Sequence, residues 1–216
     1  MTRTKWILSL LVWAALSGQA MADVFVFGGS GRLGSDVVKN LLAKGEDVVV
    51  FVRETSDRSR LAGLNVKYAV GDLLDAPSVK AAFDTHEIDA VINTVALRTG
   101  ETNPYVQGEK NIRAASEGLD LDHMILFSAT GAGDSKGMIP PQFYEEFKGT
   151  YLAREDSEQI IIESSTPYTF IRLGSVHNLP ATGKAYLDED GKLGPRALRF
   201  AGQAATNIGK PAWRNW

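Results

Sequence analysis

The 216-residue sequence contains no cysteine, which excludes a disulfide framework, a zinc–thiolate site and a cysteine nucleophile. Basic charge is not in excess either, because 23 Lys and Arg residues stand against 26 Asp and Glu residues, for a formal net charge of −3. Nucleic-acid binding needs a basic face, so we expect no nucleic-acid partner. No cluster of His, Asp and Glu has metal-ligand spacing, so we expect no metal site.

Several catalytic motifs are also absent. The G-x-S-x-G turn of serine hydrolases does not occur, and no Walker loop indicates phosphoryl transfer. The composition itself is ordinary, with 44% hydrophobic and 23% charged residues. Such a chain has enough apolar side chains to bury the core of a single α/β domain.

Residues 1–22 predict a secretory signal peptide. Arg3 and Lys5 precede an apolar run of 11 residues at 6–16, and Ala-Met-Ala at 20–22 supplies a cleavage pattern. The run is shorter than the ~20 residues of a membrane span, so we expect no stable membrane insertion once the leader is cleaved. Residues 23–216 would then form a periplasmic or secreted protein. An uncleaved anchor, a core helix and a cytoplasmic protein translated from Met21 stay open as alternatives.

Segments typical of strands and helices alternate along the rest of the chain. Apolar β-branched runs predict strands at 23–27, 48–52, 66–70, 90–92, 124–127 and 168–171. Helical spacing predicts helices at 32–44, 77–83, 104–117, 142–163 and 196–206. The alternation indicates an α/β fold, a Rossmann-type doubly wound parallel sheet in three α/β/α layers. We expect a single domain, with a loop-rich segment on the substrate side from about residue 174.

A glycine-rich loop at 28–34 (GGSGRLG) joins the first strand to the first helix and predicts a dinucleotide site. The first two glycines of the motif let the backbone turn and approach a pyrophosphate, and the third lets helix and strand pack closely. The helix start adds free N–H groups and a positive dipole. The expected cofactor contacts are Gly28, Ser30, Gly31, Arg32, Leu33 and Gly34. A glycine-rich turn without a ligand is the alternative.

Arg53 follows the second strand, about 20 residues after the loop, where an acidic residue would hold the ribose 2′-hydroxyl of NAD. An arginine there suits a 2′-phosphate instead, and Arg32 would add to the same pocket. Glu54 is evidence against this, because it could hold a hydroxyl. The sequence therefore favours NADP as the cofactor, with NAD as the alternative and a solvated Arg53 left open.

The order of motifs resembles the atypical short-chain dehydrogenase/reductases, in particular the NmrA-like NAD(P)H-binding family. The motifs are the glycine loop, GDLLD at 71–75, INTVA at 92–96, FSATGAGDS at 127–135, Glu158 and TPYTFIR at 166–172. The resemblance covers residues 23–180. It implies a Rossmann domain that uses NADP(H) or NAD(H). The family contains reductases of small ketones, flavins and phenolics as well as non-enzymatic redox sensors. By analogy with the family, the resemblance also implies a homodimer.

The resemblance also assigns roles to residues outside the glycine loop. It places cofactor contacts at Asp72, Leu73, Thr94, Val95 and Ala96. Ser128 matches the serine that hydrogen-bonds the substrate carbonyl in catalytic relatives. Each assignment has a structural alternative: Asp72 could be a turn aspartate, residues 94–96 a strand end, and Ser128 a helix-capping or turn hydroxyl.

Catalytic relatives carry a Tyr-x-x-x-Lys pair, in which tyrosine donates a proton and lysine lowers its pKa. Tyr144 and Lys148 have this spacing. The family register instead puts the lysine at Arg154 and the tyrosine at Thr150, with Tyr151 one position out of phase. An arginine cannot give up its proton, although it can hold the ribose. Three interpretations stay open: Tyr144 with Lys148, Tyr151 with Arg154, or neither pair.

Two further features concern the substrate side. Arg172 either orders the substrate-side loop or pairs with a carboxylate. His177 and Asn178 fall where a substrate pocket is expected, although a single loop histidine is more often a surface residue.

Together these features predict an NAD(P)H-dependent oxidoreductase that transfers a hydride to a small carbonyl, quinone or flavin-like substrate. A non-catalytic NAD(P)-binding redox sensor is the alternative. A nucleotide-sugar epimerase or dehydratase is weaker, because those enzymes need an intact Tyr/Lys pair and a larger C-terminal lobe.

Overall fold

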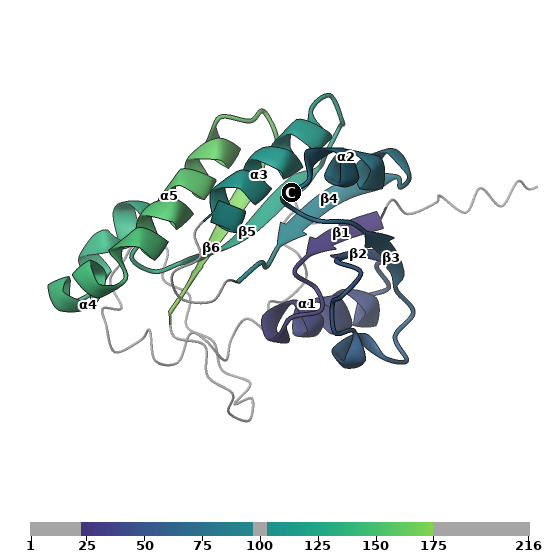
Figure 1. The fold of residues 1–216 in the computed structure, drawn as a ribbon, viewed down its shortest axis with the longest axis horizontal. Helices are drawn as coiled ribbons and strands as arrows, with labels where there is room; N and C mark the ends of the chain where they lie inside the picture. Colours follow the sequence, from purple (N-terminus) through teal and green to yellow (C-terminus); the bar gives the residue numbers. More distant parts are fainter. Residues whose placement is uncertain (1–22, 97–102, 175–216) are drawn as a thin grey trace, which may run out of the picture.

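A six-stranded, wholly parallel sheet lies at the centre of the computed structural model, which describes residues 23–96 and 103–174 (Figure 1). Its strands are β1 (Asp23–Phe27), β2 (Val48–Val52), β3 (Lys67–Val70), β4 (Ile88–Asn93), β5 (His123–Ala129) and β6 (Tyr168–Leu173). The strand order is β3-β2-β1-β4-β5-β6. The predicted Rossmann-type doubly wound sheet is confirmed.

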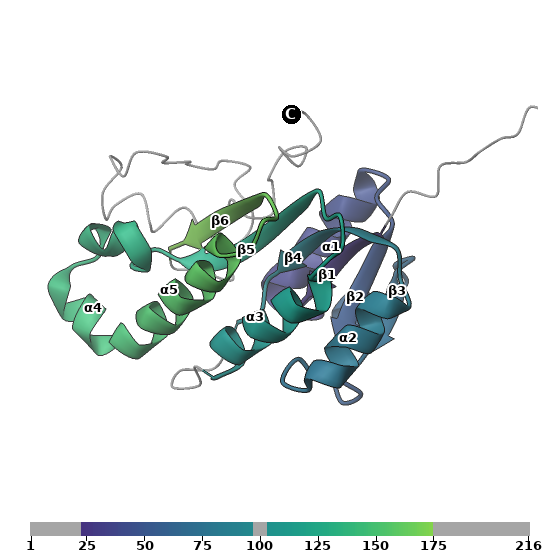
Figure 2. The ribbon, with the colours of Figure 1, turned by 90° about the horizontal axis from the view of Figure 1, so that it is seen from above.

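Helices cover both faces of this sheet. They are α1 (Arg32–Ala43), α2 (Ala76–Asp84), α3 (Asn103–Ser116), α4 (Pro141–Glu146) and α5 (Lys148–Ile162), with short 3₁₀ turns η1 (Ser59–Leu61) and η2 (Gly133–Met138). In the two perpendicular views α2, α3 and α5 lie side by side on one face, and α1 lies on the other (Figures 1 and 2). None of the helices within the described ranges is long and apolar enough to cross a membrane.

The central strand β1 is buried along its whole length because it packs against helices on both faces. On the α2–α3 face, Phe25 and Phe27 meet Phe51 and Phe83 in a cluster of aromatic rings. On the α1 face, the alternate β1 residues pack with Val38 and other aliphatic side chains. The apolar residues at 24–27 therefore contribute to two separate cores.

The predicted helix at 142–163 is interrupted. Phe147 has φ −109° and ψ 16°, outside the helical range, and it separates α4 from α5. Gly149 follows directly, and glycine is a poor helix former. The other predicted helices and strands within the described residues agree to within two residues at each end. The leader at 1–22, the helix at 196–206, His177 and Asn178 lie outside the described residues and stay predictions.

The strand order reverses between β1 and β4, which are neighbours in the sheet but not in the sequence. In doubly wound folds, ligands bind at the carboxyl ends of the strands at this point. Two backbone turns meet there, one after Phe27 and one after Asn93, which pair in register. The topology thus brings the glycine loop against the segment at 94–96.

Candidate dinucleotide-binding site

The glycine loop has the close backbone packing that its sequence predicts. Gly28 has φ +76°, in the left-handed region that favours glycine, and its carbonyl accepts a hydrogen bond of 2.9 Å from the Gly31 N–H. A Cβ on Gly34 would lie 2.2 Å from the Gly28 oxygen, where no side-chain atom fits. A Cβ on Gly31 would approach only that same oxygen, at 3.1 Å. Gly34 therefore permits the packing, while Gly31 keeps an exposed backbone surface.

The start of α1 has the features of an anion site. Gly31 is the N-cap residue, so no side chain accepts from the first-turn N–H groups, and no acidic residue lies in that turn. The positive end of the helix dipole lies at the same place. Ser30 is half-buried in the loop, and Arg32 is exposed at the first helical position. These residues fit a pyrophosphate.

Thr94 joins the turn after β4 to the glycine loop. Its backbone N–H and its hydroxyl both donate to the Phe27 carbonyl, each at 2.9 Å. The same hydroxyl oxygen would lie 2.6 Å from a Cβ on Gly34. The Thr94 side chain is therefore buried and hydrogen-bonded, and it fixes the turn after β4 against the glycine loop. Val95 and the exposed Ala96 follow directly in this turn.

Side chains hydrogen-bond both the backbone N–H and the backbone carbonyl of Val95. Its N–H donates to Asn93 Oδ1 at 3.0 Å, and its carbonyl accepts from Arg154 Nη2 at 2.9 Å. The Arg154 guanidinium lies 3.6 Å above the Tyr105 ring. Burial lowers the pKa of Arg154, while Tyr105 and the charges of Glu109 and Glu158 raise it. The structure thus shows that Arg154, which the resemblance places in the family's lysine position, fixes the turn after β4 through its hydrogen bond to Val95.

Glu109 and Asn93 are site residues that the sequence analysis did not single out. Glu109 is 1% exposed on α3, and its Oε2 accepts from Asn93 Nδ2 at 2.8 Å. Burial raises the pKa of Glu109 to about 7, although Asn93 and Arg154 oppose the rise. The sequence offers one indication that Glu109 is buried, because helical spacing puts it on the same face of α3 as Tyr105 and Ile112, which are both buried.

The predicted adenine-side residues lie at the ends of β2 and β3. Asp72 is exposed, and its Oδ1 accepts from the Leu74 N–H at 2.9 Å, which makes it a turn aspartate. Leu73 is half-buried and would lie 2.6 Å from a Cβ on Gly108 of α3. Arg53 follows β2 with its side chain exposed, and its backbone is fixed by Ser56.

Ser128 stands at the carboxyl end of β5, next to β4 in the sheet. It is 5% exposed, and its Oγ has no hydrogen-bond partner within residues 23–96 and 103–174. Nearby in sequence, Gly131 has φ +114°, and a Cβ there would lie 2.8 Å from the Tyr151 ring. Burial raises the pKa of Tyr151, and the charge of Glu146 adds to the effect.

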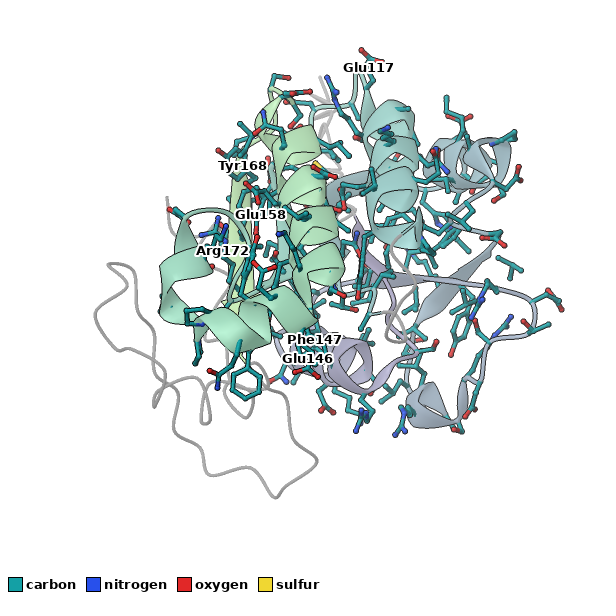
Figure 3. All side chains as sticks on the ribbon, turned by 60° about the vertical axis from the view of Figure 1, so that its left-hand side comes forward. Glu117, Glu146, Phe147, Glu158, Tyr168 and Arg172 are labelled. Carbon is teal, nitrogen blue, oxygen red and sulfur yellow. The ribbon has the colours of Figure 1, made fainter. Side chains whose placement is uncertain are left out.

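The two tyrosine pairs differ in geometry. Tyr144 belongs to α4 and Lys148 to α5, with the break between them, so they do not share a helix face. Lys148 pairs with Glu145 at 3.2 Å in solvent, whereas Tyr144 is buried. The Tyr144 ring instead stacks on Tyr151 at 5.4 Å between centroids. Figure 3 shows Glu146 and Phe147 at this junction. The catalytic role of either pair stays a prediction.

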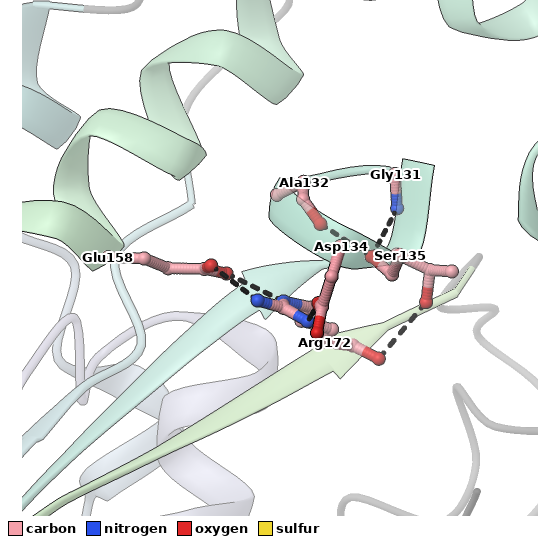
Figure 4. A network of polar contacts seen from close by, with 7 residues as sticks. Gly131, Ala132, Asp134, Ser135, Glu158 and Arg172 are labelled. Carbon is pink, nitrogen blue, oxygen red and sulfur yellow. Dashed lines mark hydrogen bonds and ion pairs between the residues drawn. The ribbon is translucent and has the colours of Figure 1, made fainter. Parts of the chain in front are cut away.

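Arg172 joins three elements through its guanidinium (Figures 3 and 4). It donates to both carboxylate oxygens of the buried Glu158 on α5, at 2.9 and 2.7 Å, and it pairs with the exposed Asp134 in η2. Gly133 has φ +54°, and a Cβ there would lie 2.8 Å from Arg172 Nη2. The expected pairing of Arg172 with a carboxylate thus occurs, and it ties η2 to β6. The substrate-side segment after residue 174 lies outside the described residues, so the other expected role stays a prediction. In the described part of the chain, no group of three or more His, Asp or Glu is placed to hold a metal.

Comparison with known proteins supports this site. The NAD(P)H-binding family matches residues 28–198. The fold is similar to ChuY, an anaerobillin reductase from Escherichia coli O157:H7, with a TM-score of 0.69 and 22% identity over 87% of this chain and 92% of that one. A UDP-glucose 4-epimerase from Erwinia amylovora is 37% identical over 83 residues, 35% of this chain and 25% of the relative. Sterol demethylase protein B from Methylococcus capsulatus is 46% identical over 79 residues, 35% of this chain and 24% of the relative.

The last two matches therefore cover about a quarter of each relative, whereas the family match extends across the glycine loop, the turn after β4 and Ser128. The family match indicates a nicotinamide dinucleotide as the cofactor. The chain belongs to the NAD(P)H-binding, NmrA-like branch of the atypical short-chain dehydrogenase/reductases.

Proposed function

We propose that this protein is an NAD(P)H-dependent oxidoreductase that reduces a small carbonyl, quinone or flavin-like substrate. The observation that carries the proposal is the Ser128 hydroxyl, which is buried without a partner among the described residues. A buried hydroxyl without a hydrogen bond lowers stability, so its presence calls for an explanation. A substrate oxygen that accepts from Ser128 would supply the missing bond.

The roles of the surrounding residues follow from their contacts. When bound, the reduced nicotinamide supplies a hydride. Ser128 orients the substrate oxygen, and Tyr151 or a water supplies the proton. The phenol of Tyr151 is protonated at neutral pH and can donate, although burial raises its pKa and makes it a weaker acid. Arg154 keeps its proton and provides positive potential while it holds Val95.

We expect Ser128→Ala to lower kcat/KM by about 100- to 1000-fold, as loss of a single donor to a reacting oxygen does. The same change removes a buried, unpartnered oxygen, so the free energy of unfolding should stay equal or rise by up to ~1 kcal/mol. Steady-state kinetics and urea unfolding measure the two effects. The matched control is Ser164→Ala, because the Ser164 hydroxyl is also buried without a partner among the described residues but lies between α5 and the amino end of β6, whereas Ser128 is at the carboxyl end of β5. Equal loss of activity in both variants would contradict the role of Ser128.

The overall test is oxidation of NADPH and NADH by the purified protein with quinones, flavins and aldehydes. Anaerobillin, the substrate class in the name of ChuY, belongs in the same panel. Tyr151→Phe and Tyr144→Phe then identify the proton donor, since only the donor's loss should lower kcat. Retained activity in both single variants would leave water as the donor.

We further propose that the cofactor is NADP rather than NAD, because Arg32 and Arg53 follow the carboxyl ends of adjacent strands. Replacing Arg53 with alanine should weaken NADPH binding about tenfold and leave NADH binding nearly unchanged, since an arginine–phosphate contact contributes roughly 1.5–3 kcal/mol. Fluorescence titration with both cofactors measures the ratio. Lys39→Ala removes the same charge from an exposed position on α1 and should change neither affinity. An unchanged NADPH/NADH ratio in Arg53→Ala would argue for NAD.

A second candidate function is a redox sensor that binds NAD(P)H without turnover. It is favoured by Arg154 in the family's lysine position and by the separation of Tyr144 from Lys148 on two helices. Tight NADPH binding with no oxidation by any substrate of the panel would support the sensor and count against the reductase. A nucleotide-sugar epimerase has weaker support, because the epimerase match covers only 25% of that enzyme.

A further inference from the structure

Glu109 is a buried carboxyl group that the proposed reduction does not use. It is 1% exposed, and one of its oxygens accepts from Asn93 Nδ2 at 2.8 Å. The other oxygen, Oε1, has no hydrogen-bond partner within the described part of the chain. Buried carboxyl groups are ordinarily paired on both oxygens, because an unpaired buried charge is costly.

The surroundings of Glu109 suggest what it does. Asn93 spans two contacts, since its Nδ2 donates to Glu109 and its Oδ1 accepts from the Val95 N–H. Arg154 donates to the carbonyl of the same residue, and its charge acts on the Glu109 carboxyl from the α5 side. The N–H and C=O of Val95 are therefore held by two side chains, one of which donates to Glu109 while the charge of the other acts on it.

We infer that Glu109 is a positioning residue that sets the Val95 peptide through Asn93 and Arg154, and that its proton makes the affinity for the dinucleotide depend on pH. The inference rests on the proposed cofactor site, because Val95 follows the residue that joins the glycine loop to β4. An ionised Glu109 gives Asn93 a charged acceptor and gives Arg154 a counter-charge. A neutral Glu109 weakens both contacts.

The charge state of Glu109 changes in the physiological range. Burial raises its pKa to about 7, against the hydrogen bond from Asn93 and the charge of Arg154. Arg154 is in turn affected by Tyr105 on α3 and by Glu158 on α5. The charged residues Lys80 and Asp84 of α2, which packs against α3, pair with each other in solvent. Among the described residues, the charge that acts on the Glu109 carboxyl is therefore that of Arg154.

The first experiment measures the Kd for NADPH between pH 5.5 and 8.5 in the wild type and in Glu109→Gln. In the wild type, affinity should rise about fivefold from pH 6 to pH 8 if binding lowers the pKa of Glu109 by one unit. Glutamine keeps the acceptor for Asn93 but cannot ionise, so its profile should lack the rise that Glu109 causes, and the ratio of wild-type to variant affinity should carry that rise. The 2′-phosphate of NADPH titrates near pH 6, but it does so in both proteins and cancels in their ratio. Glu117→Gln, at an exposed site after α3, should behave like the wild type.

A second experiment follows the backbone amide of Val95 by NMR without cofactor. Its chemical shift should titrate near pH 7 in the wild type and in Glu117→Gln, but not in Glu109→Gln. A Val95 signal that is independent of pH in the wild type, or an equal NADPH profile in wild type and Glu109→Gln, would overturn the inference. Failure to bind NADPH or NADH at any pH would instead overturn the proposed function, and the Val95 titration would still decide whether Glu109 sets this peptide.

Thermal unfolding provides a third readout, with a sign that follows from linkage. The folded protein holds the Glu109 proton more tightly than the unfolded chain, because the pKa rises from 4.5 to about 7. The stability that Glu109 contributes is therefore complete below pH 4.5 and is lost as pH rises toward and through 7. The melting temperature of Glu109→Gln should exceed that of the wild type increasingly from pH 5 to pH 8. A constant difference would show that this carboxyl does not titrate in the folded state.

Discussion

Gly34→Ala is expected to abolish measurable NADPH binding or to lower its affinity at least ~100-fold. The new Cβ would lie 2.2 Å from the Gly28 carbonyl oxygen, 2.6 Å from Thr94 Oγ1 and 2.7 Å from Gly29 Cα. Two of these three atoms belong to the backbone, so no rotation of a side chain relieves the clash. The start of α1 must move away from the loop, and the first-turn N–H groups move with it. Overpacking of this kind costs about 3 kcal/mol, the equivalent of a ~100-fold change in affinity.

The clash can be separated from the loss of phosphate contacts with two further variants. Gly31→Ala places its Cβ only against the Gly28 oxygen at 3.1 Å, so it should change stability little but obstruct the approach of the pyrophosphate. Gly149→Ala adds a Cβ that meets nothing within 4 Å, and it should bind NADPH normally and gain up to ~1 kcal/mol of stability. Fluorescence titration and urea unfolding measure both quantities in all three proteins. Normal binding and stability in Gly34→Ala would show that the loop is not packed as described.

Features that depend on neighbours in sequence could be predicted well. The strand at 23–27, the glycine loop and the start of α1 are contiguous, and their apolar run and glycine spacing determine the turn locally. The strand–helix alternation then predicts a parallel sheet, because a helical crossover returns the chain to the end of the sheet where the previous strand began. For this reason the sequence could already assign Gly34 to helix–strand packing.

Features that depend on contacts between residues far apart in the sequence could not be predicted. Glu109 looks like one more charged residue of α3, and only the fold shows that Asn93 donates to it and that the charge of Arg154 acts on it. The Tyr-x-x-x-Lys spacing from Tyr144 to Lys148 looks helical, but the non-helical backbone at Phe147 interrupts it. Spacing predicts a shared face only where the helix is continuous.

Arg172→Leu is expected to lower the free energy of unfolding by about 3–5 kcal/mol, because it leaves a buried carboxylate without its partner. Glu158 has a side chain only 3% exposed, and Arg172 donates to both of its oxygens. Leucine fills part of the volume but offers no hydrogen bond. Arg154, one turn earlier on α5, keeps some positive charge near Glu158, which places the expected loss toward the lower end of the range. Urea unfolding at pH 7 measures it.

The same arginine offers its own control, because it has a second carboxylate partner in solvent. The Asp134 side chain is 87% exposed, so Asp134→Asn should cost at most ~1 kcal/mol although it removes an ion pair to the same guanidinium. Combining Glu158→Gln with Arg172→Leu removes both partners of the buried pair. The double variant should then be more stable than Arg172→Leu alone, since no uncompensated charge remains. A double variant that is less stable than Arg172→Leu would mean that Arg172 acts mainly by anchoring η2 to β6 rather than by neutralising Glu158.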